Sequence, residues 1–101
     1  MSTAEYFAAN EARFLAEIVE FLKIPSISTD SAYAADVHRS AEWLVDRLKG
    51  IGVPQVELVE TAWHPIVEAH WPVDPNKKTV LVYGHFDVQP VDPIELWHSD
   101  P

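Results

Sequence analysis

The sequence predicts an α/β fold, in which two N-terminal helices precede about three strands that form part of a mixed sheet. Three observations support this class. Apolar residues recur at helical spacing in the first half of the chain, and two short runs of strand-forming residues follow between positions 55 and 71. A continuous apolar run at 80–83 is typical of a strand with both faces buried. With 101 residues, the chain has the length of one small domain.

The first helix is predicted to begin directly after Ser2. Ser2 and Glu5 have the spacing of a capping box, in which each side chain satisfies a free backbone donor of the other residue. The helix should end before Ile24-Pro25, because the residue before proline avoids the helical region. Its apolar stripe consists of Phe7, Phe14, Ile18, Phe21 and Leu22.

A second helix is expected to begin near Asp30 or Ser31, after a loop of hydroxyl residues at 25–29. Cationic side chains near its end suit the helix dipole, and Gly50 or Gly52 can adopt the left-handed conformation that closes a helix. The buried stripe of this helix is predicted to be Val37, Ala41, Leu44, Leu48 and Ile51.

Strands are predicted over the second half of the chain. Residues 55–60 alternate in part, as a half-exposed or edge strand does, and residues 66–71 form a second strand. Turn-forming residues fill the stretch 72–78. We therefore expect the strands at 66–71 and 79–83 to pair as a hairpin with a longer loop.

A histidine and a carboxylate follow the apolar run and are the most informative residues of the chain. In an extended backbone, alternate side chains share one side, so His85 and Asp87 should lie together. Ligands of open α/β sheets bind beyond the carboxyl ends of the strands, and Gly84 permits a sharp turn at that point. One of the two side chains can then bind a metal ion while the other orients it.

Composition excludes several classes of function. The chain has 16 acidic and 7 basic residues and a formal net charge of −9, which does not suit nucleic-acid binding. It has no cysteine, so it has no disulfide, thiolate metal site or cysteine nucleophile. No apolar run approaches the length of a membrane span and no signal-peptide pattern opens the chain, so we expect a cytoplasmic protein with no membrane partner. A serine hydrolase is disfavoured, because no Gly-x-Ser-x-Gly turn occurs and the serines at 26, 28 and 31 lie far in sequence from the strand end.

The motifs resemble those of a known family. Ile24-Pro25-Ser26-Ile27-Ser28, Lys49-Gly50-Ile51-Gly52, Tyr83-Gly84-His85-Phe86-Asp87-Val88-Gln89-Pro90 and Glu95-Leu96-Trp97 occur in family order. They are similar to the N-terminal part of the di-zinc metallopeptidases related to carboxypeptidase G, carnosinase, aminoacylase and succinyl-diaminopimelate desuccinylase. The Val-Gln-Pro form most resembles the dipeptidase branch.

This resemblance implies a zinc-dependent hydrolase that cleaves a dipeptide or an acyl-amino-acid amide bond with a metal-activated water. His85 matches a zinc ligand, and Asp87, the candidate catalytic-site residue, matches the acid that orients that imidazole. The family holds two zinc ions, and cobalt or manganese remains an alternative. The other ligands and the general base lie downstream in the family. We therefore expect residues 1–101 to be the N-terminal portion of a catalytic domain and to be inactive alone.

Several alternatives stay open on the sequence. The chain could be a non-catalytic interaction or oligomerisation module in which His85 binds nothing, and an open strand edge predicts self-association in either case. Trp97 could line a substrate cleft or pack onto the domain. Histidines 38, 64 and 70 are assigned no role in the site. Further candidate ligands on a segment interrupted by proline are Asp92, Glu95, His98 and Asp100.

Overall fold

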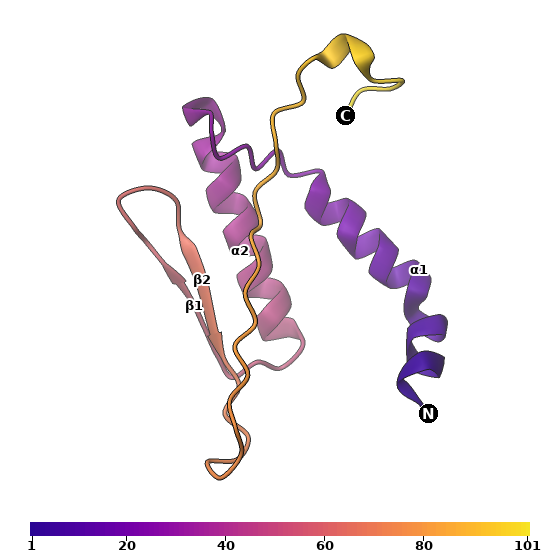
Figure 1. Ribbon diagram of the computed structural model, residues 1–101, viewed down its shortest axis with the longest axis vertical. Coiled ribbons are helices and arrows are strands. Elements are labelled where there is room, and N and C mark those ends of the chain that lie inside the picture. The colour runs from indigo at the N-terminus through magenta and orange to yellow at the C-terminus, as the bar shows by residue number, and fades with distance from the viewer.

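The computed structural model describes residues 1–101 and confirms an α/β arrangement with two helices ahead of the strands. Its elements are α1 (Thr3–Leu22), the short 3₁₀ helix η1 (Ser31–Tyr33), α2 (Ala34–Gly50), β1 (Gln55–Val59), β2 (Ile66–His70) and the 3₁₀ helix η2 (Ile94–Leu96). The hairpin of β1 and β2 lies beside α2, and α1 extends away from both (Figure 1).

Helix α1 begins with the predicted capping box. The backbone N–H of Glu5 donates to Ser2 Oγ at 3.2 Å, and the backbone N–H of Ser2 donates to Glu5 Oε2 at 2.6 Å. The predicted apolar stripe of α1 is not buried: no residue of α1 is buried, and Phe7, Ile18 and Leu22 are more than half exposed. Nothing in the chain covers this face along most of its length. The helix is not apolar enough to cross a membrane, nor is any other helix of the structure.

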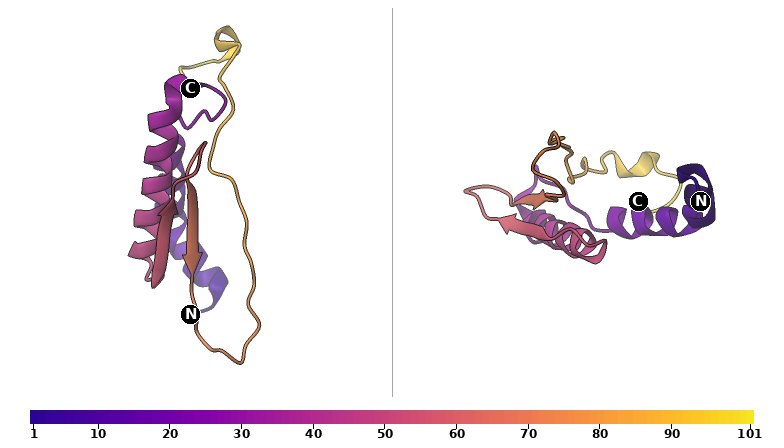
Figure 2. Two further views of the ribbon diagram at one scale, coloured as in Figure 1. Left: turned by 90° about the vertical axis from the view of Figure 1, so that its left-hand side faces the viewer. Right: turned by 90° about the horizontal axis from the view of Figure 1, so that it is seen from below.

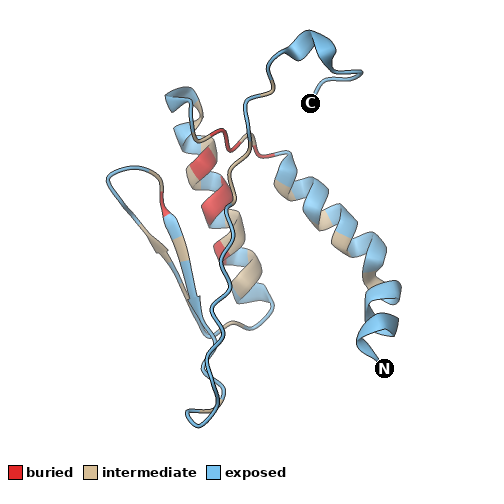
Figure 3. Cartoon of the chain, viewed as in Figure 1, coloured by how far each residue is buried: buried red, intermediate tan, exposed pale blue.

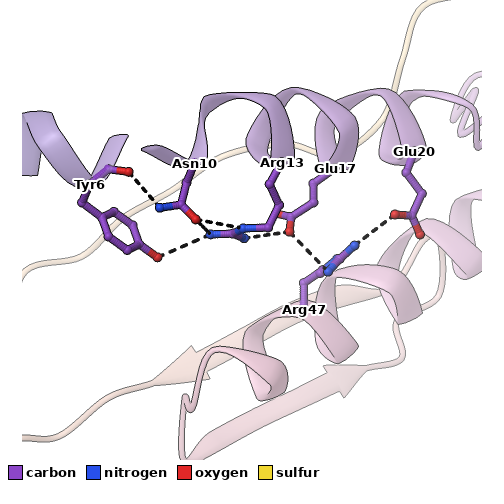
Figure 4. A network of polar contacts seen from close by, with 6 residues as sticks. All are labelled: Tyr6, Asn10, Arg13, Glu17, Glu20 and Arg47. Atoms are coloured by element: carbon purple, nitrogen blue, oxygen red, sulfur yellow. Dashed lines mark hydrogen bonds and ion pairs between the residues drawn. The ribbon is translucent and has the colours of Figure 1, made fainter. Parts of the chain in front are cut away.

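The C-terminal half of α1 contacts α2 through ion pairs (Figure 4) and through one pair of aromatic rings. Arg47 of α2 donates to Glu20 Oε2 at 3.0 Å and lies 3.6 Å from Glu17 Oε1. The rings of Phe21 and Trp43 stack with their centroids 4.8 Å apart. These contacts fix where α1 meets α2, while its N-terminal half projects freely.

Helix α2 supplies most of the small core. Asp30 caps η1 by accepting a hydrogen bond from the backbone N–H of Ala32, so the helical region begins where it was predicted. The buried residues of α2 are Val37, Ser40, Ala41 and Val45, which are coloured red in the helix (Figure 3), and α2 contacts both strands of the hairpin.

Within the predicted stripe of α2, Val37 and Ala41 are buried, whereas Ile51 is 66% exposed, which corrects that expectation. Leu44 and Leu48 are half-buried. Ile51 lies beyond the last turn, because the helix ends at Gly50 and Gly52 adopts the left-handed conformation with φ 94°.

Strands β1 and β2 pair with each other in antiparallel register, from Gln55 opposite His70 to Val59 opposite Ile66. The expected hairpin between 66–71 and 79–83 is therefore wrong. The connection at 60–65 is short and closed by its own hydrogen bonds, in which Thr61 Oγ1 accepts from Trp63 N–H and donates to the carbonyl of His64. The stretch 71–78 contains two prolines, which donate no backbone hydrogen bond.

The third expected strand does not form. Residues 79–83 are extended but unpaired, and Val80, Leu81 and Val82 are 81%, 91% and 87% exposed. This segment stands apart from α2 and the hairpin (Figure 2). A buried strand needs neighbouring strands at its edges and packed elements on its faces, and this chain provides neither there.

The whole chain consequently exposes a large surface. Its radius of gyration is 16.6 Å, against about 13 Å for a compact domain of this length. Its accessible surface is 8425 Å², against about 5,800 Å² for a folded monomer of this mass. Only eight residues are buried, so the apolar face of α1 and the segment 79–83 remain uncovered.

Candidate metal-binding site

The site is built where the loop after α1 lies against the segment that follows the apolar run. Ile27 and Val88 form an isolated parallel bridge, and the backbone N–H of Val88 donates to the carbonyl of Ser26 at 3.0 Å. Ser26 is 2% exposed, and its hydroxyl donates to the carbonyl of Phe86 at 3.0 Å. These two hydrogen bonds hold residues 86–88 beside the loop although about 60 residues of sequence separate them.

His85 and Asp87 lie together as the sequence predicted. The Nδ1–H of His85 donates to Asp87 Oδ1 at 2.8 Å. The histidine side chain is 78% exposed, and its Nε2 has no hydrogen-bond partner in the chain. With the proton on Nδ1, Nε2 carries a free lone pair toward solvent, which is the form in which imidazole binds a metal ion.

The second carboxylate oxygen of Asp87 also has a partner. Ser28 Oγ donates to Asp87 Oδ2 at 2.6 Å. The Ser28 hydroxyl, followed by the His85 imidazole, lowers the pKa of the Asp87 carboxyl below its ordinary value. The carboxylate is therefore ionised at neutral pH and accepts hydrogen bonds at both oxygens.

A third element reaches this loop from the hairpin. His64, in the connection between β1 and β2, donates from Nε2 to the carbonyl of Ser28 at 2.8 Å. Sequence reasoning assigned no function to Ser28 or His64. The sequence signals for them were the run of hydroxyl residues at 25–29 and a histidine directly before Pro65. Neither signal predicts which distant residue Ser28 or His64 contacts.

The candidate ligands on the C-terminal segment do not join His85. No three histidine or acidic side chains gather closely enough to hold a metal ion. Asp92 instead lines a shallow depression of about 450 Å³ with Asp30 and Tyr33. Trp97 packs onto its own segment, donating from Nε1 to the carbonyl of Val91 at 2.7 Å. The structure therefore brings His85 and Asp87 together and gathers no third possible ligand beside them.

The structure also tests the serine-nucleophile alternative. Ser26 and Ser28 lie beside the end of the apolar run after all, so their distance in sequence was a poor guide to their position. The Ser28 hydroxyl donates to the carboxylate and makes no hydrogen bond to His85. A serine nucleophile needs its proton taken by the imidazole, so this arrangement is not that of a catalytic triad.

Comparison with known proteins finds similarity to dipeptidases. No family model matches it. It is 36% identical to the Cys-Gly metallodipeptidase DUG1 of Candida albicans, over 88% of this chain and 21% of that protein. A shorter stretch, 37% of this chain and 7% of the relative, is 49% identical to the human Beta-Ala-His dipeptidase. The solved structure of the dipeptidase Dug1p from Saccharomyces cerevisiae superposes with a TM-score of 0.85 at 27% identity, over 96% of this chain and 22% of that one. The chain thus spans about a fifth of the length of the fungal relatives.

Proposed function

We propose, from the premise that this chain is homologous to the N-terminal part of metallodipeptidases, that it supplies one metal ligand to a dipeptide-hydrolysing site. The observation that carries the proposal is the His85–Asp87 pair. Nδ1 of His85 is engaged by Asp87, and Nε2 of this exposed imidazole has no partner in the chain.

The residues of this chain have separate roles in the proposed site. His85 would hold the metal through Nε2, and Asp87 would fix the ring and its tautomer through Nδ1. The names of the relatives imply a metal cofactor, and we propose zinc as a pair of ions, with cobalt or manganese as alternatives. A bound divalent ion lowers the pKa of water and stabilises charge on the attacked carbonyl oxygen.

A dipeptide is the proposed substrate, in preference to an acyl-amino acid. Two relatives are named for dipeptides, Cys-Gly in one and Beta-Ala-His in the other. These two dipeptides differ in size and charge, so the shared feature is an amide bond in a two-residue substrate. The non-catalytic interaction module is not favoured, because the similarity runs along most of the chain and is to enzymes.

A chimera tests this proposal. The 101 residues replace the corresponding N-terminal segment of the Saccharomyces cerevisiae dipeptidase, and zinc-dependent hydrolysis of Cys-Gly is measured. We expect His85→Ala to abolish turnover and to lower the bound zinc. The matched control is His70→Ala, an exposed histidine whose Nε2 contacts only Glu68 at 2.8 Å, and it should retain both. Full turnover and zinc content in the His85→Ala chimera would refute the proposal.

A further inference from the structure

The geometry points to Ser28 as a positioning residue that fixes the carboxylate of Asp87 and, through it, the tautomer of His85. The inference rests on the proposed function, in which His85 binds metal through Nε2. It adds a residue of the loop after α1 to the proposed site.

The two oxygens of Asp87 have separate partners. Oδ1 accepts from His85 Nδ1 at 2.8 Å, and Oδ2 accepts from Ser28 Oγ at 2.6 Å. A carboxylate held at both oxygens does not rotate without losing both hydrogen bonds. Because the His85 side chain is 78% exposed, packing does not fix its ring, and the hydrogen bond to Asp87 has to do so. Without the Ser28 hydroxyl, the carboxylate would be free to turn and the ring would lose its fixed partner.

Ser28 is itself held in place from two sides. The preceding residue, Ile27, is buried and forms the bridge with Val88. The carbonyl of Ser28 accepts from His64 Nε2 at 2.8 Å, and the loop that carries His64 is closed by Thr61. The Ser28 hydroxyl is therefore held beside the Asp87 carboxylate, because contacts on both sides fix the loop that carries it.

The chemical consequence concerns one proton. Nε2 binds a metal ion only when the ring proton lies on Nδ1, and the hydrogen bond to an oriented carboxylate favours that tautomer. Removal of the Ser28 hydroxyl should shift neutral His85 toward a mixture of both tautomers. Loss of such a supporting contact typically lowers metal affinity by about 10 to 100-fold, and we expect about tenfold here because Asp87 remains.

The test measures the ring nitrogen shifts of His85 in ¹⁵N-labelled protein, at a pH where the ring is neutral. Zinc is then titrated into the same variants of the chimera, whose downstream part comes from the Saccharomyces cerevisiae dipeptidase. Ser28→Thr and Ser28→Val form a matched pair, because the two side chains have the same shape and only threonine has the hydroxyl. Ser28→Ala is the plain deletion. Ser31→Ala is the control, since Ser31 lies just beyond the same loop and its hydroxyl makes no hydrogen bond.

We expect the Nδ1–H tautomer in the wild type, in Ser28→Thr and in Ser31→Ala, and a tautomer mixture with a zinc midpoint about tenfold higher in Ser28→Val and Ser28→Ala. Equal tautomers in the threonine and valine variants, or a mixture in the wild type, would overturn the inference. If the wild-type chimera binds no zinc, or binds as much as its His85→Ala variant does, the proposed function fails, while the tautomer comparison still decides the role of Ser28.

Discussion

Two buried serines of this chain should respond in opposite directions to the same substitution. Ser26 and Ser40 are 2% and 0% exposed. The Ser26 hydroxyl donates to the carbonyl of Phe86 at 3.0 Å, whereas the Ser40 hydroxyl on α2 is buried without a partner. Replacement of each by alanine thus removes a satisfied hydroxyl in one case and an unsatisfied hydroxyl in the other.

The expected magnitudes follow from these contacts. A typical internal hydrogen bond contributes about 1 kcal/mol net, and the half-buried Phe86 carbonyl regains part of its solvation. Ser26→Ala should therefore lower the free energy of unfolding by about 1 kcal/mol, which lowers the ratio of folded to unfolded protein roughly fivefold. Ser40→Ala should raise it by about 1 kcal/mol, because it removes a buried unpaired group and places a better helix former in α2.

Urea unfolding followed by far-UV circular dichroism measures both changes. Amide hydrogen exchange at Val88 provides a local reading, because its N–H donates to the carbonyl of Ser26. Exchange there should accelerate in Ser26→Ala and stay unchanged in Ser40→Ala. Equal destabilisation by the two substitutions would show that burial alone, and not hydrogen bonding, decides the effect, and would refute the reasoning.

Three further predictions concern pH, association and activity. Glu60, with a smaller effect from Glu42, holds the pKa of His38 above its ordinary value, so the stabilising pair is complete below about pH 6.5 and is lost as the pH rises through the raised pKa. NMR titration should show a lower His38 pKa in Glu60→Gln, and an unchanged pKa would contradict the pairing. The unpaired, apolar segment 79–83 should make the protein self-associate at high micromolar concentration in sedimentation experiments, and Val82→Lys should weaken this. If the wild-type protein stays monomeric, segment 79–83 does not act as an open edge that pairs with a second chain. The 101-residue chain with excess zinc should not hydrolyse dipeptides, because it gathers fewer than the three ligands of a catalytic zinc. Chelator-sensitive turnover that disappears in His85→Ala would refute that expectation.

Local patterns in the sequence were sufficient to predict the two helices and the contact between His85 and Asp87. The capping box of Ser2 and Glu5 and the glycine at 52 act within a few residues, so the limits of α1 and α2 could be predicted. His85 and Asp87 are two residues apart in an extended backbone, so their contact follows from strand geometry. Motif order was likewise sufficient to identify the dipeptidase resemblance.

The tertiary structure alone decided which surfaces are covered and which distant residues meet. An apolar run such as 80–83 has the composition of a buried strand, but burial depends on neighbours, and in this chain the run is exposed. Strand β2 pairs with β1 and not with residues 79–83, although turn-forming residues precede the second segment as well. Ser28 reaches Asp87 across 59 residues of sequence, and His64 reaches Ser28 across 36. Such contacts leave no periodic trace in the sequence, because they depend on how whole elements pack and not on the conformation of adjacent residues.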